Sequence, residues 1–207
     1  FKDQDNWADY AVVLSNLGLT YQTAAEAGLE PKTNLVRSID AFAEAAKLLM
    51  DQKNMAAYAI VQTSHGGALR ILADYGWGTE ESLGQSVRML LEAADLLKLQ
   101  SDEGNYAGAQ NQIGMVFQAL ANRGIESETN FGKSVGALVE AARLFEKQGN
   151  LPNYAVARSN LGLTHQSLAL YGIDSDANFK RSAEDLEEAT QLWKKLGSWA
   201  DFALANN

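Results

Sequence analysis

Hydrophobic and polar positions along the chain recur with a period of 48 residues. One point of the period is marked by an aromatic residue followed by alanine. These aromatic residues are Tyr10, Tyr58, Tyr106, Tyr154 and Phe202. Between them the apolar residues are spaced as on one face of a helix, and the alternation typical of strands does not occur. A fixed period of this length is typical of stacked repeats. The pattern therefore predicts an all-α fold of four helix-turn-helix repeats and the beginning of a fifth.

The first helix of each repeat has recognisable signals at both ends. It begins at an N-cap type of residue, whose side-chain oxygen accepts a hydrogen bond from the first turn. These residues are Asn6, Asn54, Asp102, Asn150 and Ser198. It ends at a glycine followed by an apolar residue, which predicts a Schellman motif with the glycine in the left-handed conformation. These glycines are Gly28, Gly76, Gly124 and Gly172.

The second helix follows a short polar loop and is also predicted to begin at an N-cap residue. These residues are Asn34, Ser82, Asn130 and Asn178. The predicted helices have about 20 and about 17 residues. The repeats then have the approximate bounds 6–53, 54–101, 102–149 and 150–197, and residues 198–207 form a terminal stub. All of them belong to a single predicted domain, 1–207.

Three further residue types recur in phase. A glycine inside each first helix is predicted to let neighbouring helices approach closely, which explains its recurrence despite its cost to a helix. A serine in each second helix is predicted to be a small residue at a helix contact, because no histidine shares its phase. A ladder of glutamates is predicted to be solvated or to form salt bridges, since repeats about 10 Å apart cannot share one calcium ion. The residues are Gly18, Gly66, Gly114 and Gly162; Ser38, Ser86, Ser134 and Ser182; and Glu44, Glu92, Glu140 and Glu188.

The chain resembles the tetratricopeptide repeat family. Leu17 and Gly18 are followed three residues later by the aromatic Tyr21, which is a pattern of that family's first helix. Two of the four repeats depart from it, with Leu69 and His165 at the aromatic position. The family's repeat has about 34 residues, so the helices of this chain would be longer. The resemblance implies a right-handed α-solenoid in which each repeat contacts only its neighbours.

The resemblance also implies a concave groove, where proteins of this kind bind peptides. The first helices would line it with Ser15, Gln22, Thr63, Arg70, Asn111, Gln118, Ser159 and Gln166. Leu19, Gly67, Met115 and Leu163 would join them. This surface is neutral except for one arginine, so the sequence does not specify a peptide.

Charge and composition disfavour several classes of function. The net charge of −9 argues against nucleic-acid binding, and no apolar run approaches the roughly 18 residues of a membrane span. The absence of cysteine excludes thiolate metal sites and a cysteine nucleophile. His65 and His165 lie in different repeats and phases, so they predict no metal site. His65 is expected to pack against the core with one polar partner, and His165 replaces an aromatic residue. We therefore predict a non-enzymatic protein without a catalytic, cofactor or metal site.

The two ends of the chain repeat each other. The segment around Trp7 and Tyr10 recurs around Trp199 and Phe202. Solenoids normally need terminal repeats with a polar outer face, and neither end has that composition. The sequence therefore favours head-to-tail self-association into a filament or tube. The alternatives are a segment of a longer array and a monomeric adaptor that binds a partner peptide. The compartment stays open between the cytoplasm and secretion after removal of a signal.

Overall fold

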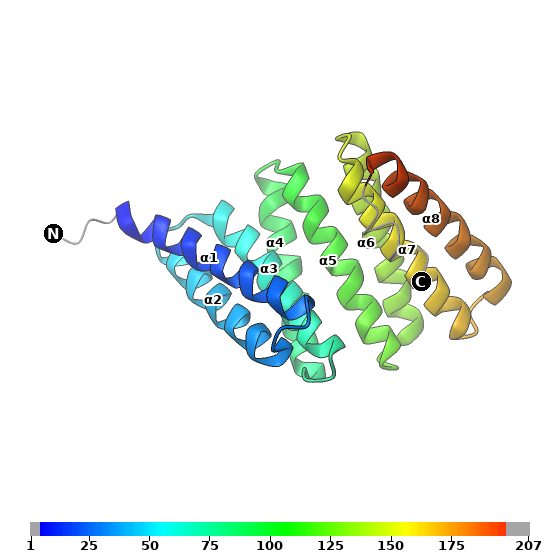
Figure 1. Cartoon of the computed structure of the whole chain (residues 1–207), viewed down its shortest axis with the longest axis horizontal. Coiled ribbons are helices and arrows are strands. Elements are labelled where there is room, and N and C mark those ends of the chain that lie inside the picture. Colours follow the sequence, from blue (N-terminus) through cyan, green and yellow to red (C-terminus); the bar gives the residue numbers. More distant parts are fainter. Residues whose placement is uncertain (1–4, 198–207) are drawn as a thin grey trace. The chain divides into compact units, whose positions relative to one another are not determined.

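The computed structural model describes residues 5–197, which form eight α-helices and no strand. The helices are α1 (Asp5–Glu26), α2 (Pro31–Asp51), α3 (Met55–Asp74), α4 (Glu80–Leu99), α5 (Glu103–Asn122), α6 (Ser127–Lys147), α7 (Leu151–Leu170) and α8 (Ser175–Leu196) (Figure 1). The prediction of an all-α fold is confirmed for this part of the chain. The second helices are longer than predicted, with 20 to 22 residues.

The chain divides into two compact units, Phe1–Asn105 and Tyr106–Asn207. In the first unit, α2 packs against both α1 and α3, and one core cluster joins Leu14, Phe42 and Val61 from these three helices. In the second unit, α6 packs against α7, which packs against α8. Within each unit the helices therefore pack in consecutive pairs, and the second helix of one hairpin covers the first helix of the next.

The ends of the first helices confirm the Schellman prediction. The four glycines that end them have φ between 78° and 87°, a conformation that glycine adopts without steric cost. At the end of α7 the amide of Gly172 donates to the carbonyl of Ala169 at 3.1 Å, and that of Ile173 to Leu168 at 3.0 Å. These are the two hydrogen bonds of the motif. Leu168 and Ile173 also contact one core cluster, which is the predicted hydrophobic clasp.

The beginnings of the first helices agree with the sequence at three positions. Asn54, Asp102 and Asn150 each accept a hydrogen bond from the backbone amide three residues later, at 3.1 to 3.3 Å. The prediction for Asn6 is wrong, because α1 already begins at Asp5. Ser198 lies outside the described residues.

The predicted beginnings of the second helices are wrong. In the three hairpins that carry an asparagine here, the second helix begins three residues before it. The asparagines therefore lie inside the first turn: Asn34, Asn130 and Asn178. Their side-chain amides instead donate to the carbonyl of the loop residue five positions earlier, at 2.7 to 2.8 Å. The residue before each of these helices adopts the left-handed conformation, as Glu30 does with φ 38°. A second helix can therefore follow the Schellman glycine with almost no loop. In α4 the cap is Thr79 rather than Ser82.

The recurring glycines and serines lie where the two helices of a hairpin meet. A Cβ added to Gly18 would come within 2.7 Å of the Phe42 ring, so the close approach predicted for this position is confirmed. Ser38 is buried on the facing helix and donates to the carbonyl of Gly18 at 2.8 Å. Ser86 makes the same contact with Gly66 at 2.7 Å. The prediction that these serines lie at helix contacts is confirmed.

Candidate functional site

Helices α3 and α7 each bury one apolar face against the second helix of the preceding hairpin. On α3 this face includes Val61, which is 3% exposed and belongs to the same core cluster as Phe42 of α2. On α7 it includes Ala157, which is 0% exposed and lies in one cluster with Phe145 of α6. A repeated contact between hairpins therefore exists within each unit.

The corresponding face of α1 is exposed. Val13 stands at the position of Val61 and Ala157 and is 61% exposed. Leu17 is 40% exposed, whereas its counterpart Leu161 on α7 is 3% exposed. This face, which we call the α1 open face, consists of Tyr10, Val13, Leu17, Thr20 and Ala24. No helix of the described residues covers it as α2 covers α3.

The last described helix has a matching open face. On α6, the residues that cover α7 include Phe131 and Phe145, both nearly fully buried. Their counterparts on α8 are Phe179, which is 46% exposed, and Trp193, which is half-buried. Residues seven apart lie on one helix face. We call Phe179, Leu186, Thr190 and Trp193 the α8 open face.

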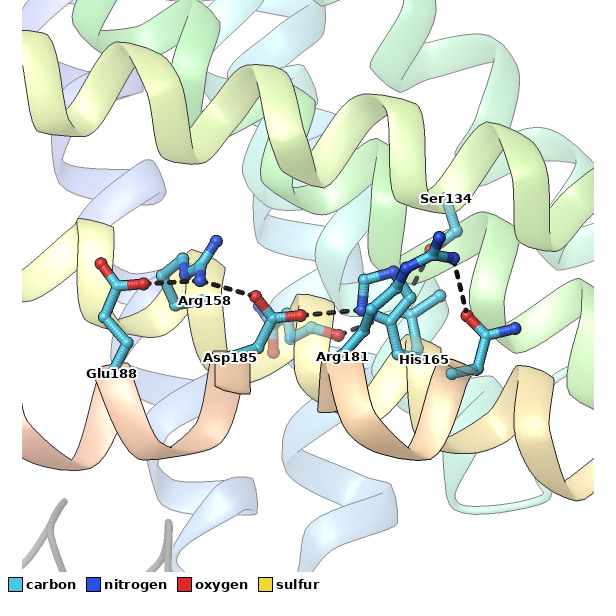
Figure 2. A network of polar contacts seen from close by, with 9 residues as sticks. Ser134, Arg158, His165, Arg181, Asp185 and Glu188 are labelled. Carbon is cyan, nitrogen blue, oxygen red and sulfur yellow. Dashed lines mark hydrogen bonds and ion pairs between the residues drawn. The ribbon is translucent and has the colours of Figure 1, made fainter. Parts of the chain in front are cut away.

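Behind this face, α8 is joined to α7 by a partly buried charged network (Figure 2). Arg158 contacts Asp185 at 2.9 Å and Glu188 at 2.5 Å. On its other side, Asp185 contacts Nδ1 of His165 at 2.7 Å. Tyr154 donates its hydroxyl proton to Glu188. We call these five residues the charged network, and they alternate between the two helices.

The charged network is confined to the fourth repeat. Where it has Arg158 and Asp185, the other hairpins have uncharged residues: Leu14, Gln62 and Gln110, and Ala41, Met89 and Ala137. Asp185 is 4% exposed, so removal of Arg158 would leave its charge in an apolar interface with His165 as its only remaining partner among the described contacts. Sequence analysis missed the network. A signal existed, since Arg158, His165 and Asp185 all depart from the repeat at positions that face the partner helix.

Recurring glutamates accept hydrogen bonds from recurring tyrosines of the first helices. We call this contact between the two helices of a hairpin the tyrosine–glutamate latch. Tyr10 donates to Glu44 at 3.2 Å, and Tyr58 donates to Glu92 at 3.4 Å. The Tyr154–Glu188 bond of the charged network is the same contact in the fourth repeat. Burial, together with the carboxylate of Glu188, raises the pKa of Tyr154 to about 12. Glu44 and Glu92 are exposed, whereas Glu140 and Glu188 form salt bridges, in agreement with the prediction.

His65 lies in the core, as predicted, but its expected polar partner is missing at Nδ1. The side chain is 6% exposed and lies beside the Phe42 ring, with centroids 6.4 Å apart. Its Nδ1 atom is buried without a hydrogen-bond partner. Burial lowers the pKa of His65 to about 4, against the opposing charge of Asp40.

The residues predicted to line a groove lie along the first helices, and two of them, Asn111 and Gln118, bond to residues of α7 that were not predicted. Asn111 accepts a hydrogen bond from Asn160 at 3.0 Å, and Gln118 donates to Ser167 at 3.4 Å, so α5 and α7 are joined here. Arg70 is only 9% exposed and pairs with Asp74 of its own helix, so the one cation of this surface is largely withdrawn from solvent. The remaining predicted positions are half-buried or exposed: Ser15, Gln22, Thr63, Ser159 and Gln166.

Aliphatic side chains are exposed at equivalent repeat positions of two first helices, one in each unit. Val12 and Leu19 of α1 are 53% and 44% exposed, and Val156 and Leu163 of α7 are 37% and 45% exposed. Residues seven apart share a helix face. The groove itself remains a prediction. The sequence described its surface as neutral, and the structure adds that part of this surface is apolar.

Of the four residues predicted at the self-association ends, the structure describes two. Trp7 and Tyr10 are 42% and 41% exposed, with ring centroids 6.0 Å apart in an edge-to-face arrangement. Trp199 and Phe202 lie outside the described residues. Within residues 5–197, no cluster of His, Cys, Asp and Glu is placed to hold a metal ion. No helix in this range is long and apolar enough to cross a membrane.

Comparison with known proteins finds no protein-family model and no curated protein that matches the chain.

Proposed function

We propose that the protein is a non-enzymatic structural scaffold that self-associates head to tail, with copies of itself as its partner. The α8 open face of one copy covers the α1 open face of the next, as α6 covers α7 within one chain. The chain is then a right-handed, tetratricopeptide-like α-solenoid that continues from copy to copy into a filament or tube. The observation that supports this most is the 61% exposure of Val13, against 3% for Val61 and 0% for Ala157.

The chemistry of the two open faces favours association. Contiguous exposed apolar residues on a protein surface mark interaction sites, and burial of apolar area contributes about 25 cal/mol per Å². The two faces differ from each other, and within each unit a second-helix face always meets a first-helix face. The contact between copies is therefore heterologous, and such contacts form open filaments unless the rotation happens to close a ring.

Size-exclusion chromatography with light scattering, together with negative-stain microscopy, tests the proposal on the full chain. The native protein should form assemblies that grow with concentration, and a 22.4 kDa monomer at high concentration would contradict it. Val13→Glu should abolish assembly because it places a charge on the α1 open face. The matched control is Val12→Glu, whose side chain is also exposed but lies outside that face, and it should assemble normally.

A mixing experiment separates head-to-tail contacts from symmetric ones. Val13→Glu keeps its α8 open face, and Phe179→Glu keeps its α1 open face. Each variant alone should be monomeric, and an equal mixture should form a dimer that grows no further. Dimers of either variant alone would contradict the head-to-tail arrangement.

The second candidate is an adaptor that binds a partner peptide in the groove, within this chain or a longer array. The exposed Val12, Leu19, Val156 and Leu163 favour it. Peptides selected from a random library should then bind native protein and Val13→Glu equally, and should lose affinity for Val12→Glu and Leu163→Glu.

A further inference from the structure

A hydroxyl pair marks the contact between α6 and α7. Ser134 and Thr164 are both 0% exposed, and their hydroxyl oxygens are 3.3 Å apart. Thr164 donates its own proton to the carbonyl of Asn160 at 2.9 Å. Its oxygen therefore accepts the proton of Ser134. This bond fixes how far α7 can slide along α6.

The two halves of the same pair occur at the α1 open face, as the exposed Thr20, and beside the α8 open face, as Ser182, which is 5% exposed. Ser182 stands on α8 where Ser134 stands on α6, and Thr20 stands on α1 where Thr164 stands on α7. The other first helices have Ala68 and Val116 at this position, and neither can accept a hydrogen bond through its side chain. Thr20 already donates its proton to the carbonyl of Asn16 at 2.8 Å, as Thr164 does to Asn160. Its oxygen is thus oriented to accept from a serine that approaches from outside.

We infer that copies join in one register, in which the Ser182 hydroxyl of one chain donates to the Thr20 hydroxyl of the next. This inference rests on the proposed self-association and adds the alignment of the two helices. It continues a contact that already exists within the chain, between α6 and α7. The α1 open face thus carries Thr20, the residue that matches Ser182 of a second copy. A second copy is therefore its occupant.

Neighbouring apolar residues support the same alignment. Phe131 shares a cluster with Leu168 and Ile173 on the far side of the Ser134–Thr164 pair. In the joint, Phe179 would occupy the place of Phe131 and would cover Ala24 and Leu29 of the next copy. Leu29 is 63% exposed in the isolated chain. At the other end of the contact, Trp193 and Val13 stand at the positions of Phe145 and Ala157, so apolar residues would meet there as well.

Engineered disulfides test the register without background, because the chain has no cysteine. The variant Thr20→Cys/Ser182→Cys should give a ladder of linked species at multiples of 22.4 kDa on non-reducing electrophoresis, which reductant removes. The matched control is Thr23→Cys/Ser182→Cys, since Thr23 is an exposed threonine about one turn along α1 from Thr20 and is not part of the α1 open face. We expect at least about tenfold less linked product for this control, because its thiols are not brought together in the joint. Ser134→Cys/Thr164→Cys should link within one chain and shows that the geometry permits a disulfide.

The outcomes separate this inference from the proposed function. If light scattering of the reduced proteins shows assembly and the internal pair links, but Thr20→Cys/Ser182→Cys gives no ladder, the register is overturned while self-association stands. Equal linking of the Thr23→Cys control also overturns it. If the reduced protein stays monomeric, the proposed function and the register fail together.

Discussion

The two units bury polar side chains in different ways. In the second unit, Arg158, His165 and Asp185 form a connected set in which each charge contacts an opposite charge or a hydrogen-bond partner. Unpartnered buried atoms occur in both units, at Nδ1 of His65 and Nε of Arg70 on α3 and at Nε of Arg158 within the connected set itself. What distinguishes the second unit is the connected set, which joins α7 to α8. Removal of one member of a connected set leaves its buried partners unpaired and so destabilises the protein. An unpartnered buried group already lowers the stability of the native protein. The connected set and the unpartnered His65 should therefore respond differently to mutation.

The largest effect is expected when the connected set loses its centre. Asp185→Ala leaves His165 without its carboxylate and removes one of the two partners of Arg158. We expect a loss of about 3 kcal/mol in the free energy of unfolding, as for other broken buried ion pairs. Urea denaturation followed by circular dichroism measures it. A loss no larger than that of an ordinary exposed substitution would mean that the charged network does not hold α8 on α7.

Replacing the whole set should give the opposite result. The triple variant Arg158→Leu, His165→Tyr and Asp185→Ala installs the residues that the first hairpin has at these positions, Leu14, Tyr21 and Ala41. Apolar replacements of buried ion pairs are often neutral or stabilising. We expect the triple variant to unfold at a urea concentration equal to or above that of the native protein. If it is as unstable as Asp185→Ala alone, the network stabilises the folded protein by more than its charges neutralising one another.

Acid should affect the unpartnered histidine of the first unit next. The pKa of His65 is about 4 in the folded protein and about 6.5 when unfolded. The unfolded state therefore binds more protons, and stability falls as pH drops from about 6.5 towards 4. At pH 4.5 the loss from this group is on the order of 2 kcal/mol. Because carboxylates also titrate there, the measurement is the difference between native protein and His65→Leu at pH 7.5 and pH 4.5.

His65→Leu is a suitable comparison because the corresponding residues of the first and fourth repeats, Leu17 and Leu161, are leucine. It should be at least as stable as native protein at pH 7.5 and should lose less stability on acidification. Equal losses in both proteins would show that His65 is not the group responsible.

The glycine contacts distinguish a second helix that the next hairpin covers, α2, from one that no described helix follows, α8. A Cβ on Gly18 would lie 2.7 Å from the Phe42 ring, and one on Gly162 would lie 2.8 Å from Leu186. Phe42 is fully buried, whereas Leu186 is half-buried and can move. We expect Gly18→Ala to cost about 2 kcal/mol, and Gly162→Ala about 1 kcal/mol, by thermal or urea denaturation. The control Gly136→Ala meets no atom within 4 Å and should gain about 0.5 to 1 kcal/mol.

The features that sequence predicted well are those with a local signal repeated in phase. The glycine endings are decided by chain geometry at one residue, and the glycine and serine positions at helix contacts were found because they recur in every repeat. The beginnings of the second helices failed for a physical reason. Asn34 has the residue type of an N-cap, but its amide donates to a carbonyl before the helix, and residue type does not give the direction of a hydrogen bond.

The charged network could not be derived from local signals, since Arg158 and Asp185 meet only after α7 packs on α8. The open faces are similar in this respect. The repeat predicts which residues of α1 face a preceding hairpin, but their exposure depends on whether a neighbour is there. The ends were therefore identified by comparison of equivalent positions, and the alignment of Ser182 with Thr20 emerged only from the Ser134–Thr164 contact.

The smallest effect is expected at the tyrosine–glutamate latch, which the first and last hairpins share. Tyr154→Phe removes a donor from Glu188 inside the charged network and should cost about 1 kcal/mol. Tyr10→Phe removes the same bond at an exposed position, where water replaces the hydroxyl, so its effect on unfolding should be smaller. Parallel urea titrations of the two variants measure the difference. Equal losses would mean that the latch acts alike in both hairpins, and that the connected charges of the second unit do not strengthen it.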